Sequence, residues 1–171
     1  YTCNSRCSTC NIWKKKANNL TVEEYRKIFK SVGHSPYWVT FSGGEPFLRE
    51  DIVDVVRTIY EVSRPAIINI PTNGILTKTI VENVDAITAA CPKSQIIINL
   101  SLDGFDSQHD EIRGVPGNYK KTTATYTRLK ALKAPNLSVG IHTVISKFNV
   151  ESFSMVANEL LRLEPDSYIT E

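Results

Sequence analysis

The sequence predicts an α/β fold with parallel strands, arranged as a partial (β/α) barrel. Helix-like and strand-like segments alternate along the chain, and no repeat, linker or low-complexity tract divides them. In residues 95–102, apolar side chains alternate with a face that becomes polar toward the C-terminal end. The competing architecture, an open doubly wound sheet between two helix layers, needs apolar side chains on both faces. A polar inner face instead favours strands that line a ligand-holding lumen.

The composition fits one globular domain with a substantial core. The chain has 171 residues, of which 42% are apolar, with 20 Lys and Arg against 18 Asp and Glu. The net charge of +2 is too small for a general nucleic-acid-binding surface. No stretch approaches the roughly 18 apolar residues of a membrane span, and the N-terminus lacks the layout of a secretory signal. We therefore expect a cytoplasmic chain.

The first half of the chain predicts three helices and two strands. A capping box at Thr21-Val-Glu-Glu24 begins the first helix, an amphipathic one whose apolar positions run to Val32. Residues 38–42 form a strand that leads through Gly-Gly into a helix with apolar positions between 52 and 59. Residues 66–70 form the next strand, closed by Pro-Thr-Asn-Gly, and apolar positions between 80 and 87 mark the third helix.

The second half predicts two further strands, at residues 95–102 and 136–145, and the start of another at 167–169. A polar segment bounded by glycines follows the first of these, and a helix with a weak apolar stripe covers residues 118–133. Asn149 is expected to cap a last helix whose inward apolar positions run from Val150 to Leu161. In a parallel sheet of this kind, the ligand site lies at the C-terminal ends of the strands.

Three of the four cysteines crowd into the first ten residues, at Cys3, Cys7 and Cys10. In a reducing compartment such crowding indicates metal or cluster ligation rather than a disulfide. A structural zinc needs four ligands, and the spare donors His34 and Cys91 stand in no ligand-pair spacing. Iron–sulfur cubanes usually take four cysteines, so three thiolates would leave one iron open to an exogenous ligand. We expect Cys91 to be a small buried hydrophobe.

The Cys-x3-Cys-x2-Cys spacing is followed about 30 residues later by Gly-Gly-Glu-Pro at the end of a predicted strand. This combination resembles the radical S-adenosylmethionine (radical SAM) superfamily over nearly the whole chain. Thr72-Asn-Gly and Ser101-Leu-Asp-Gly at the next strand ends fit the same layout. One departure is Thr9, where the family often places an aromatic residue near the adenine.

The resemblance implies a [4Fe-4S] cluster held by Cys3, Cys7 and Cys10, with the fourth iron chelated by the methionine moiety of SAM. Reductive cleavage of SAM would then yield a 5′-deoxyadenosyl radical that abstracts hydrogen from an unidentified substrate. A low-potential electron donor such as flavodoxin or ferredoxin is the implied partner. The run Lys14-Lys15-Lys16 is a candidate surface for it, although short charge runs are most often solvated surface.

The resemblance also implies a SAM site made by residues at the strand ends. Glu45 would accept from the SAM amino group, Ser101 would meet the ribose, and Arg113 would bind the carboxylate. The serine and arginine roles come from the likeness of residues 101–113 to radical SAM members related to peptide maturases and sulfatase-maturing enzymes. The predicted cofactor-binding residues are Gly43, Gly44, Glu45, Pro46, Thr72, Asn73, Ser101, Asp103 and Arg113.

Each of these residues also has a structural alternative. Residues 43–46 and 72–74 could be turns, with Glu45 complementing a helix dipole. Arg113 could be an exposed partner of Asp110 or Glu111, and Asp103 could contact substrate or cap the next segment. His109 and Asp110 could belong to a solvated turn. For His142, which sits on the polar strand face, a hydrogen-bonded structural role competes with one facing the substrate.

The sequence therefore predicts a radical SAM core domain over residues 1–171, active in peptide or cofactor maturation. The alternative from another class is a non-catalytic zinc or electron-transfer iron–sulfur module. A complete eight-strand barrel takes about 250 residues. The chain starts at Tyr1, with its single methionine at position 155. We expect a TIM-like barrel truncated at both ends, without its first strand and its closing strands.

Overall fold

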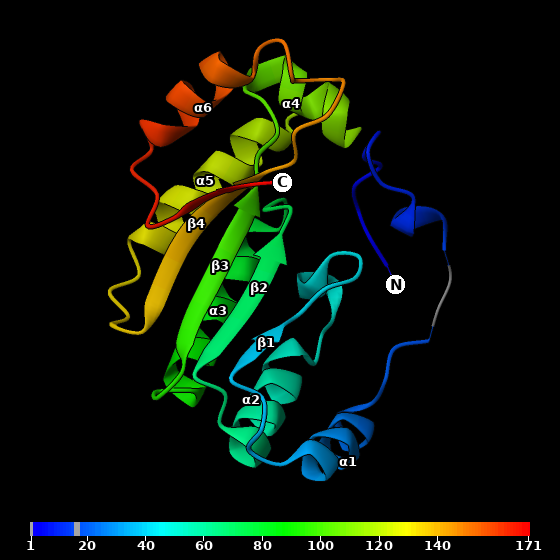
Figure 1. Cartoon of the computed structure of the whole chain (residues 1–171), viewed down its shortest axis with the longest axis vertical. Coiled ribbons are helices and arrows are strands. Elements are labelled where there is room, and N and C mark those ends of the chain that lie inside the picture. The colour runs from blue at the N-terminus through cyan, green and yellow to red at the C-terminus, as the bar shows by residue number, and fades with distance from the viewer. Residues whose placement is uncertain (1, 16–17) are drawn as a thin grey trace.

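The computed structural model describes residues 2–15 and 18–171. Five strands alternate with helices along the chain, as the sequence predicts (Figure 1). The strands are β1 Trp38–Thr40, β2 Ile67–Thr72, β3 Gln95–Ser101, β4 Leu137–Thr143 and β5 Tyr168–Thr170. The helices are α1 Val22–Val32, α2 Ile52–Ser63, α3 Thr77–Ala90, α4 Asp106–Arg113, α5 Asn118–Lys130 and α6 Phe153–Leu161, with short 3-10 turns η1 Ile12–Lys14 and η2 Pro46–Leu48.

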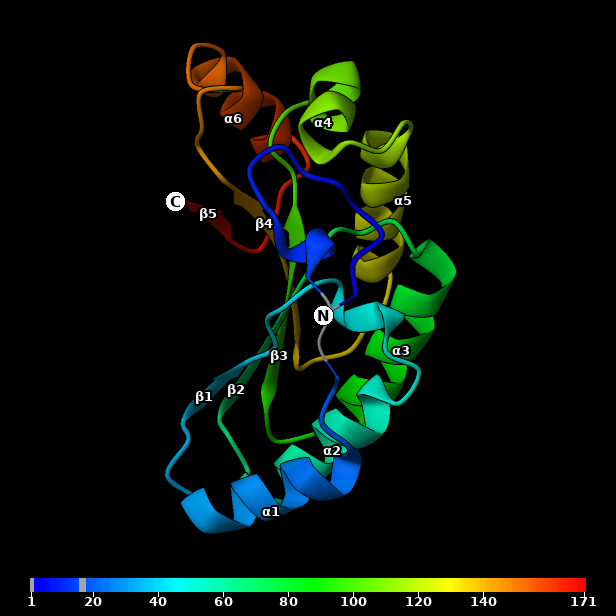
Figure 2. The same cartoon turned by 90° about the vertical axis from the view of Figure 1, so that its right-hand side faces the viewer.

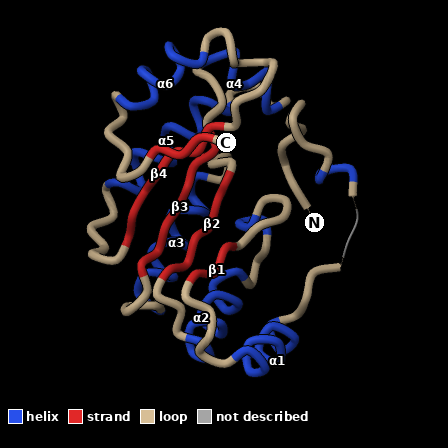
Figure 3. The backbone as a smooth tube through the Cα atoms, viewed as in Figure 1, coloured by secondary structure: helices blue, strands red, loops and turns tan. Residues whose placement is uncertain are grey.

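The strands form one parallel sheet in the sequential order β1-β2-β3-β4-β5. Because all four strand pairings are parallel, the carboxyl ends of the strands meet at the same edge of the sheet (Figure 3). Helices α2, α3 and α5 lie along one face, and the sheet curves around the other face as a half-barrel (Figure 2). The prediction of a partial (β/α) barrel is confirmed.

The two faces of the central strands differ in chemistry. The helix-facing side chains of β2 and β3, among them Ile68, Ile96 and Ile98, are completely buried and form the middle of the core. The opposite face carries Asn69 and Asn99, whose side chains are hydrogen bonded to each other at 3.0 Å. The expected polar inner face is therefore present, and it is the face that looks into the half-barrel.

The first helix, α1, begins with the predicted capping box. Thr21 Oγ1 accepts from Glu24 N at 3.2 Å, and Glu24 Oε2 accepts from Thr21 N at 2.7 Å. Two of its apolar residues, Ile28 and Val32, are 45% and 43% exposed, so the apolar stripe of this amphipathic helix is only partly covered. The reason is that α1 packs on α2 at the margin of the fold and touches no strand broadly.

Helix α4 occupies the segment that the sequence left without an element. Its eight residues are mostly charged or polar, so they carry no helical apolar stripe. His109 and Ile112 are buried and hold the helix against the fold, and Gly114 ends it in the left-handed conformation. The alternative of a solvated turn therefore does not hold for His109. Asp110 accepts from the backbone N–H of Tyr119 at 2.8 Å and joins α4 to α5.

The inward positions expected for the last helix are partly wrong, because Val150 and Leu161 are 55% and 48% exposed, whereas Val156 and Leu160 are buried.

The expected cap of the last helix is also wrong. Helix α6 begins at Phe153, after Ser152, whose side chain makes no capping hydrogen bond. Asn149 instead lies in the preceding turn, where its Oδ1 accepts from Ser146 N at 2.7 Å. Its amide donates to the carbonyl oxygens of Asp103 and Val144, both at 2.9 Å. Asn149 therefore ties the end of β3 to the segment after β4.

Asn136, just before β4, yields a prediction about stability. Its amide donates to three carbonyl oxygens at and beyond the C-terminal end of α3, those of Thr88, Cys91 and Ser94, at 3.1–3.2 Å. Asn136→Ala should lower the free energy of unfolding by about 1–3 kcal/mol, because three carbonyl groups lose this donor and, among the described residues, only that of Cys91 keeps another, from Ser94 N. Urea unfolding measures this loss, with Asn158→Ala on the exposed face of α6 as a control that should change stability little. Equal stability of the two variants would contradict the role of Asn136.

Candidate cofactor site

A cavity of about 420 Å³ lies at the carboxyl ends of the strands, between the sheet and the cysteine loop, residues 2–11. The loop has no regular secondary structure of its own and lies to the side of the C-terminal ends of the strands (Figure 1). The cavity collects all predicted site residues except Asp103 from five separate segments of the chain. Those residues are Cys3, Cys7, Cys10, Gly43, Gly44, Glu45, Pro46, Thr72, Asn73, Ser101 and Arg113.

The three cysteines of the loop are free thiols that face this common cavity. Cys7 is buried, Cys3 is half-buried and Cys10 is exposed. Burial, with the nearby Glu45 and the other two cysteines, raises the pKa of Cys3. Within residues 2–15 and 18–171, no three His, Cys, Asp or Glu side chains already converge as a metal site. Soft thiolate donors on one short loop fit an iron–sulfur cluster or another thiophilic metal.

Backbone hydrogen bonds position the cysteine loop at two places. The N–H of Glu45 donates to Thr2 O at 2.9 Å, beside Gly44. A Cβ at Gly44 would lie 2.0 Å from the same carbonyl oxygen, so only glycine permits this approach. On the far side, Arg6 N donates to Arg113 O at 3.1 Å.

A second bond joins the loop to α4, from Ser8 N to Ile112 O at 2.8 Å. Gly114, at φ 64°, lies so close that a Cβ there would be 2.6 Å from Arg6 O. The end of α4 and the Gly-Gly turn thus hold the loop from opposite sides.

Glu45 follows β1 in the chain, and its buried side chain contacts the C-terminal end of β2. It accepts from Thr72 Oγ1 and Asn73 N, both at 2.8 Å, and from Phe47 N at 3.1 Å. Burial raises the pKa of Glu45, and these hydrogen bonds oppose the rise. Glu45 caps η2 through Phe47, as the structural alternative predicts, and it also faces the cavity.

The turn at residues 72–74 is tied both to the loop and to α5. Asn73 Nδ2 donates to Asn4 Oδ1 at 2.7 Å, and its Oδ1 accepts from Ile75 N at 3.1 Å. Thr122 Oγ1 of α5 donates to Asn73 O at 2.7 Å. Asn73 therefore serves as a turn residue and also contacts the cysteine loop.

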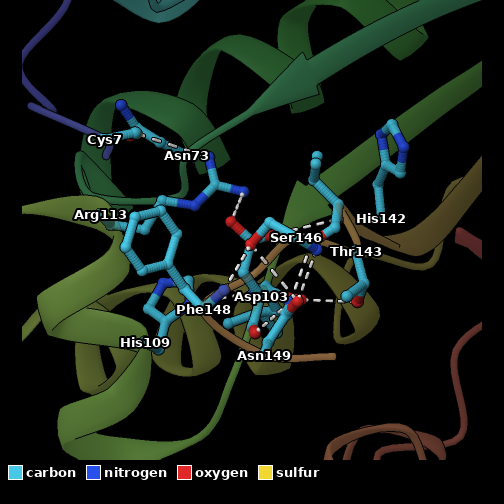
Figure 4. Close-up of polar contacts among 12 residues, drawn as sticks. Cys7, Asn73, Asp103, His109, Arg113, His142, Thr143, Ser146, Phe148 and Asn149 are labelled. Atoms are coloured by element: carbon cyan, nitrogen blue, oxygen red, sulfur yellow. Dashed lines mark hydrogen bonds and ion pairs between the residues drawn. The ribbon is translucent and has the colours of Figure 1, made fainter. Parts of the chain in front are cut away.

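Asp103 does not line the cavity, although Ser101, on the same strand, does. Its side chain is completely buried, and its Oδ2 lies 2.8 Å from Arg113 Nη2. Arg113 therefore pairs with Asp103 and with neither Asp110 nor Glu111, the alternatives weighed from the sequence. Its guanidinium also reaches Cys7, with Nη1 3.8 Å from Sγ (Figure 4).

Several lining residues were not assigned a site role from the sequence. Ser5 is buried, and its hydroxyl has no partner among the described residues. His142 lines the cavity with its Nε2 3.6 Å from Glu171 and without a hydrogen bond at that atom, so it is not the hydrogen-bonded structural histidine. A serine inside the cysteine motif and a histidine on the polar strand face were the available signals.

The surface beside the loop carries the lysine run. Lys14 and Lys15 are exposed, and Lys14 Nζ lies 5.0 Å from the centroid of the Trp13 ring. Arg6 lies 6.0 Å from the same ring. Lys16, the third residue of the run, lies outside the described residues.

Among the residues that the structure covers, no helix has both the length and the apolarity of a membrane span.

Comparison with known proteins agrees with this arrangement. The profile of the radical SAM superfamily matches residues 1–160, and the chain therefore belongs to that superfamily. Its enzymes use SAM and an iron–sulfur cluster. The solved structure of native anSMEcpe with bound AdoMet superposes with a TM-score of 0.76 at 18% identity, over 99% of this chain and 48% of that chain, which supports the fold.

Two relatives are similar in sequence over most of this chain. An AdoMet-dependent heme synthase of Methanosarcina barkeri (strain Fusaro / DSM 804) is 30% identical over 159 residues, 89% of this chain and 42% of the relative. The sporulation killing factor maturation protein SkfB of Bacillus subtilis (strain 168) is 26% identical over 160 residues, 92% of this chain and 37% of the relative. The chain thus spans about two fifths of the length of these relatives.

The contact between Gly114 and the cysteine loop yields a prediction. Gly114→Ala should disturb the loop, because the new methyl group would collide with the carbonyl of Arg6. We expect a lower iron content after anaerobic reconstitution. The matched control is Gly117→Ala, which introduces the same left-handed strain at φ 73° but meets no atom within 4 Å. Both variants should lose about 1–2 kcal/mol of stability from backbone strain. An equal iron content in the two variants would contradict the role of the contact between Gly114 and the cysteine loop.

Proposed function

We propose that this chain is the SAM-cleaving core of a radical SAM enzyme, with a [4Fe-4S] cluster held by Cys3, Cys7 and Cys10. The observation that carries the proposal is the single cavity that joins the cysteine loop to the strand ends. The donors on one side are soft thiols, and those on the other side suit the polar groups of SAM. When bound, the cluster and SAM supply a 5′-deoxyadenosyl radical that abstracts hydrogen from a substrate.

The protein's part in this chemistry is to bind and orient SAM. Glu45 offers a fixed carboxylate for the amino group, held in place by its three hydrogen bonds. Arg113 has a buried Nε without a partner among the described residues, which is a donor suited to the SAM carboxylate. Ser101 and the turn at residues 72–74 line the same cavity on the side proposed for the ribose. The glycines at 43 and 44 let SAM approach the backbone.

The proposed reaction class is the maturation of a peptide or a cofactor. The motif at residues 101–113 favours it, and the relatives named for heme synthesis and for the maturation of a sporulation killing factor support it. The proposed partner is a low-potential donor such as flavodoxin or ferredoxin, received by Lys14 and Lys15 beside the exposed Cys10. Free thiols and an oxygen-sensitive cluster fit the reducing cytoplasm as the proposed location.

The decisive experiment is anaerobic reconstitution with iron and sulfide, followed by dithionite and SAM. We expect 5′-deoxyadenosine to form in proportion to cluster content, measured by liquid chromatography with mass spectrometry. Omission of dithionite is the control, because the sulfonium bond is cleaved reductively. A fully loaded cluster that yields no 5′-deoxyadenosine would overturn the enzyme proposal for this chain. A colourless protein with one bound zinc would support the zinc module instead.

The ligand set is tested by replacing one cysteine at a time. Cys7→Ala should abolish the brown absorption of the reconstituted cluster, because two thiolates remain where three are proposed. Cys91→Ala is the matched control, because Cys91 is buried away from the cavity and burial raises its pKa to about 12. That control should keep a normal visible spectrum and iron content. A normal cluster in Cys7→Ala would refute the ligand assignment.

A further inference from the structure

Asp103 is the predicted site residue that the cavity does not include, and its surroundings indicate a different role. Its side chain is completely buried. Asp103 Oδ1 accepts from Val144 N at 2.9 Å, in the segment that follows β4. Its backbone is fixed as well, because its N–H donates to His109 Nδ1 at 3.1 Å and its carbonyl accepts from Asn149. Asp103 is therefore held by two neighbouring segments, α4 and the segment after β4.

The charge of Asp103 is balanced by Arg113. His109 lies beside it, but burial lowers the pKa of His109 to about 4, so this ring is neutral near pH 7. The positive partner in contact with the carboxylate is the guanidinium, 2.8 Å away, in an ion pair whose N–H is not aligned for a hydrogen bond. A buried carboxylate without this cation would be costly, so the pair fixes where the guanidinium lies.

The other end of the guanidinium lies at the cysteine loop. Arg113 Nη1 is 3.8 Å from Cys7 Sγ, and the side chain is only 12% exposed (Figure 4). The carbonyl oxygen of Arg113 also accepts a hydrogen bond from the backbone N–H of Arg6, one residue before Cys7. Both the position of the cation and the position of the thiol are therefore set by the same residue of α4.

We propose that Asp103 is a positioning residue that holds Arg113 against Cys7, and that Arg113 thereby raises the reduction potential of the cluster that Cys7 ligates. This inference rests on the proposed function. A reduced cluster carries one more negative charge than an oxidised one. A fixed cation beside a ligating sulfur stabilises the reduced form, because net charge and contacts to the sulfurs set the potential of such clusters. This influence of Arg113 on the reduction potential is distinct from any contact between Arg113 and SAM.

The test is the midpoint potential of the reconstituted cluster, measured without SAM. Under that condition any influence of Arg113 on the potential comes from its contact with Cys7 and not from SAM. Arg113→Gln should shift the potential to a more negative value. Arg113→Lys, which keeps the charge but cannot span both partners as a planar fork, should give an intermediate shift. The matched control is Arg162→Gln, at the exposed C-terminal cap of α6, which removes the same charge and should leave the potential unchanged.

The positioning role of Asp103 is tested by a double-mutant cycle. If Asp103 acts through Arg113, the shifts of Asp103→Asn and Arg113→Gln do not add in the double variant. Additive shifts would overturn the positioning role. If Asp103→Asn fails to hold a cluster, the double variant decides. Recovery of cluster binding there supports the positioning role of Asp103, because the cation that lost its partner has been removed. Continued loss of the cluster counts against that role.

One outcome separates this inference from the proposed function. A wild-type chain that forms the cluster and produces 5′-deoxyadenosine, while Arg113→Gln keeps the wild-type potential, overturns the inference alone. In that case a weaker binding of SAM by Arg113→Gln would assign the guanidinium to the SAM carboxylate only. Failure of the wild-type chain to cleave SAM, with the potential shift present, would instead overturn the proposed function and leave the cluster contact standing.

Discussion

The site depends on a few backbone hydrogen bonds that hold an irregular loop across the ends of a regular sheet. The cysteine loop has no helix or strand to fix its course over residues 2–11. It is positioned by Thr2 O on one side and by the N–H groups of Arg6 and Ser8 on the other. Backbone bonds of this kind need close approach, which explains why glycines stand at positions 44 and 114. Small changes at these contacts therefore alter metal binding without touching a cysteine.

The parts of the fold that could be predicted from the sequence are those that depend on local periodicity and motif spacing. The five strands alternate with helices as expected, and the polar inner face was visible in the alternation of residues 95–102. The cavity residues were predictable for a related reason. Parallel strands end at one edge, so motifs that follow successive strands are brought together by topology alone.

The parts that could not be predicted depend on contacts between distant residues. Helix α4 has a single strongly apolar residue, Ile112, so its formation follows from burial and not from pattern. Arg113 has acidic neighbours at 110 and 111, yet it pairs with Asp103 because that carboxylate is buried where no water can solvate it. Asn149 looked like a helix cap in sequence, whereas the fold uses its amide to join two loops.

A half-barrel, unlike a closed one, leaves two strands with an unpaired side. In the part of the chain that the structure describes, those strands are β1 and β5, and each is only three residues long. Short edges expose few free N–H and C=O groups, which limits strand addition by a neighbouring molecule. The exposed side chains of Trp38 and Ile169 lie on these edges, so any segment that paired with either edge would also cover an apolar side chain.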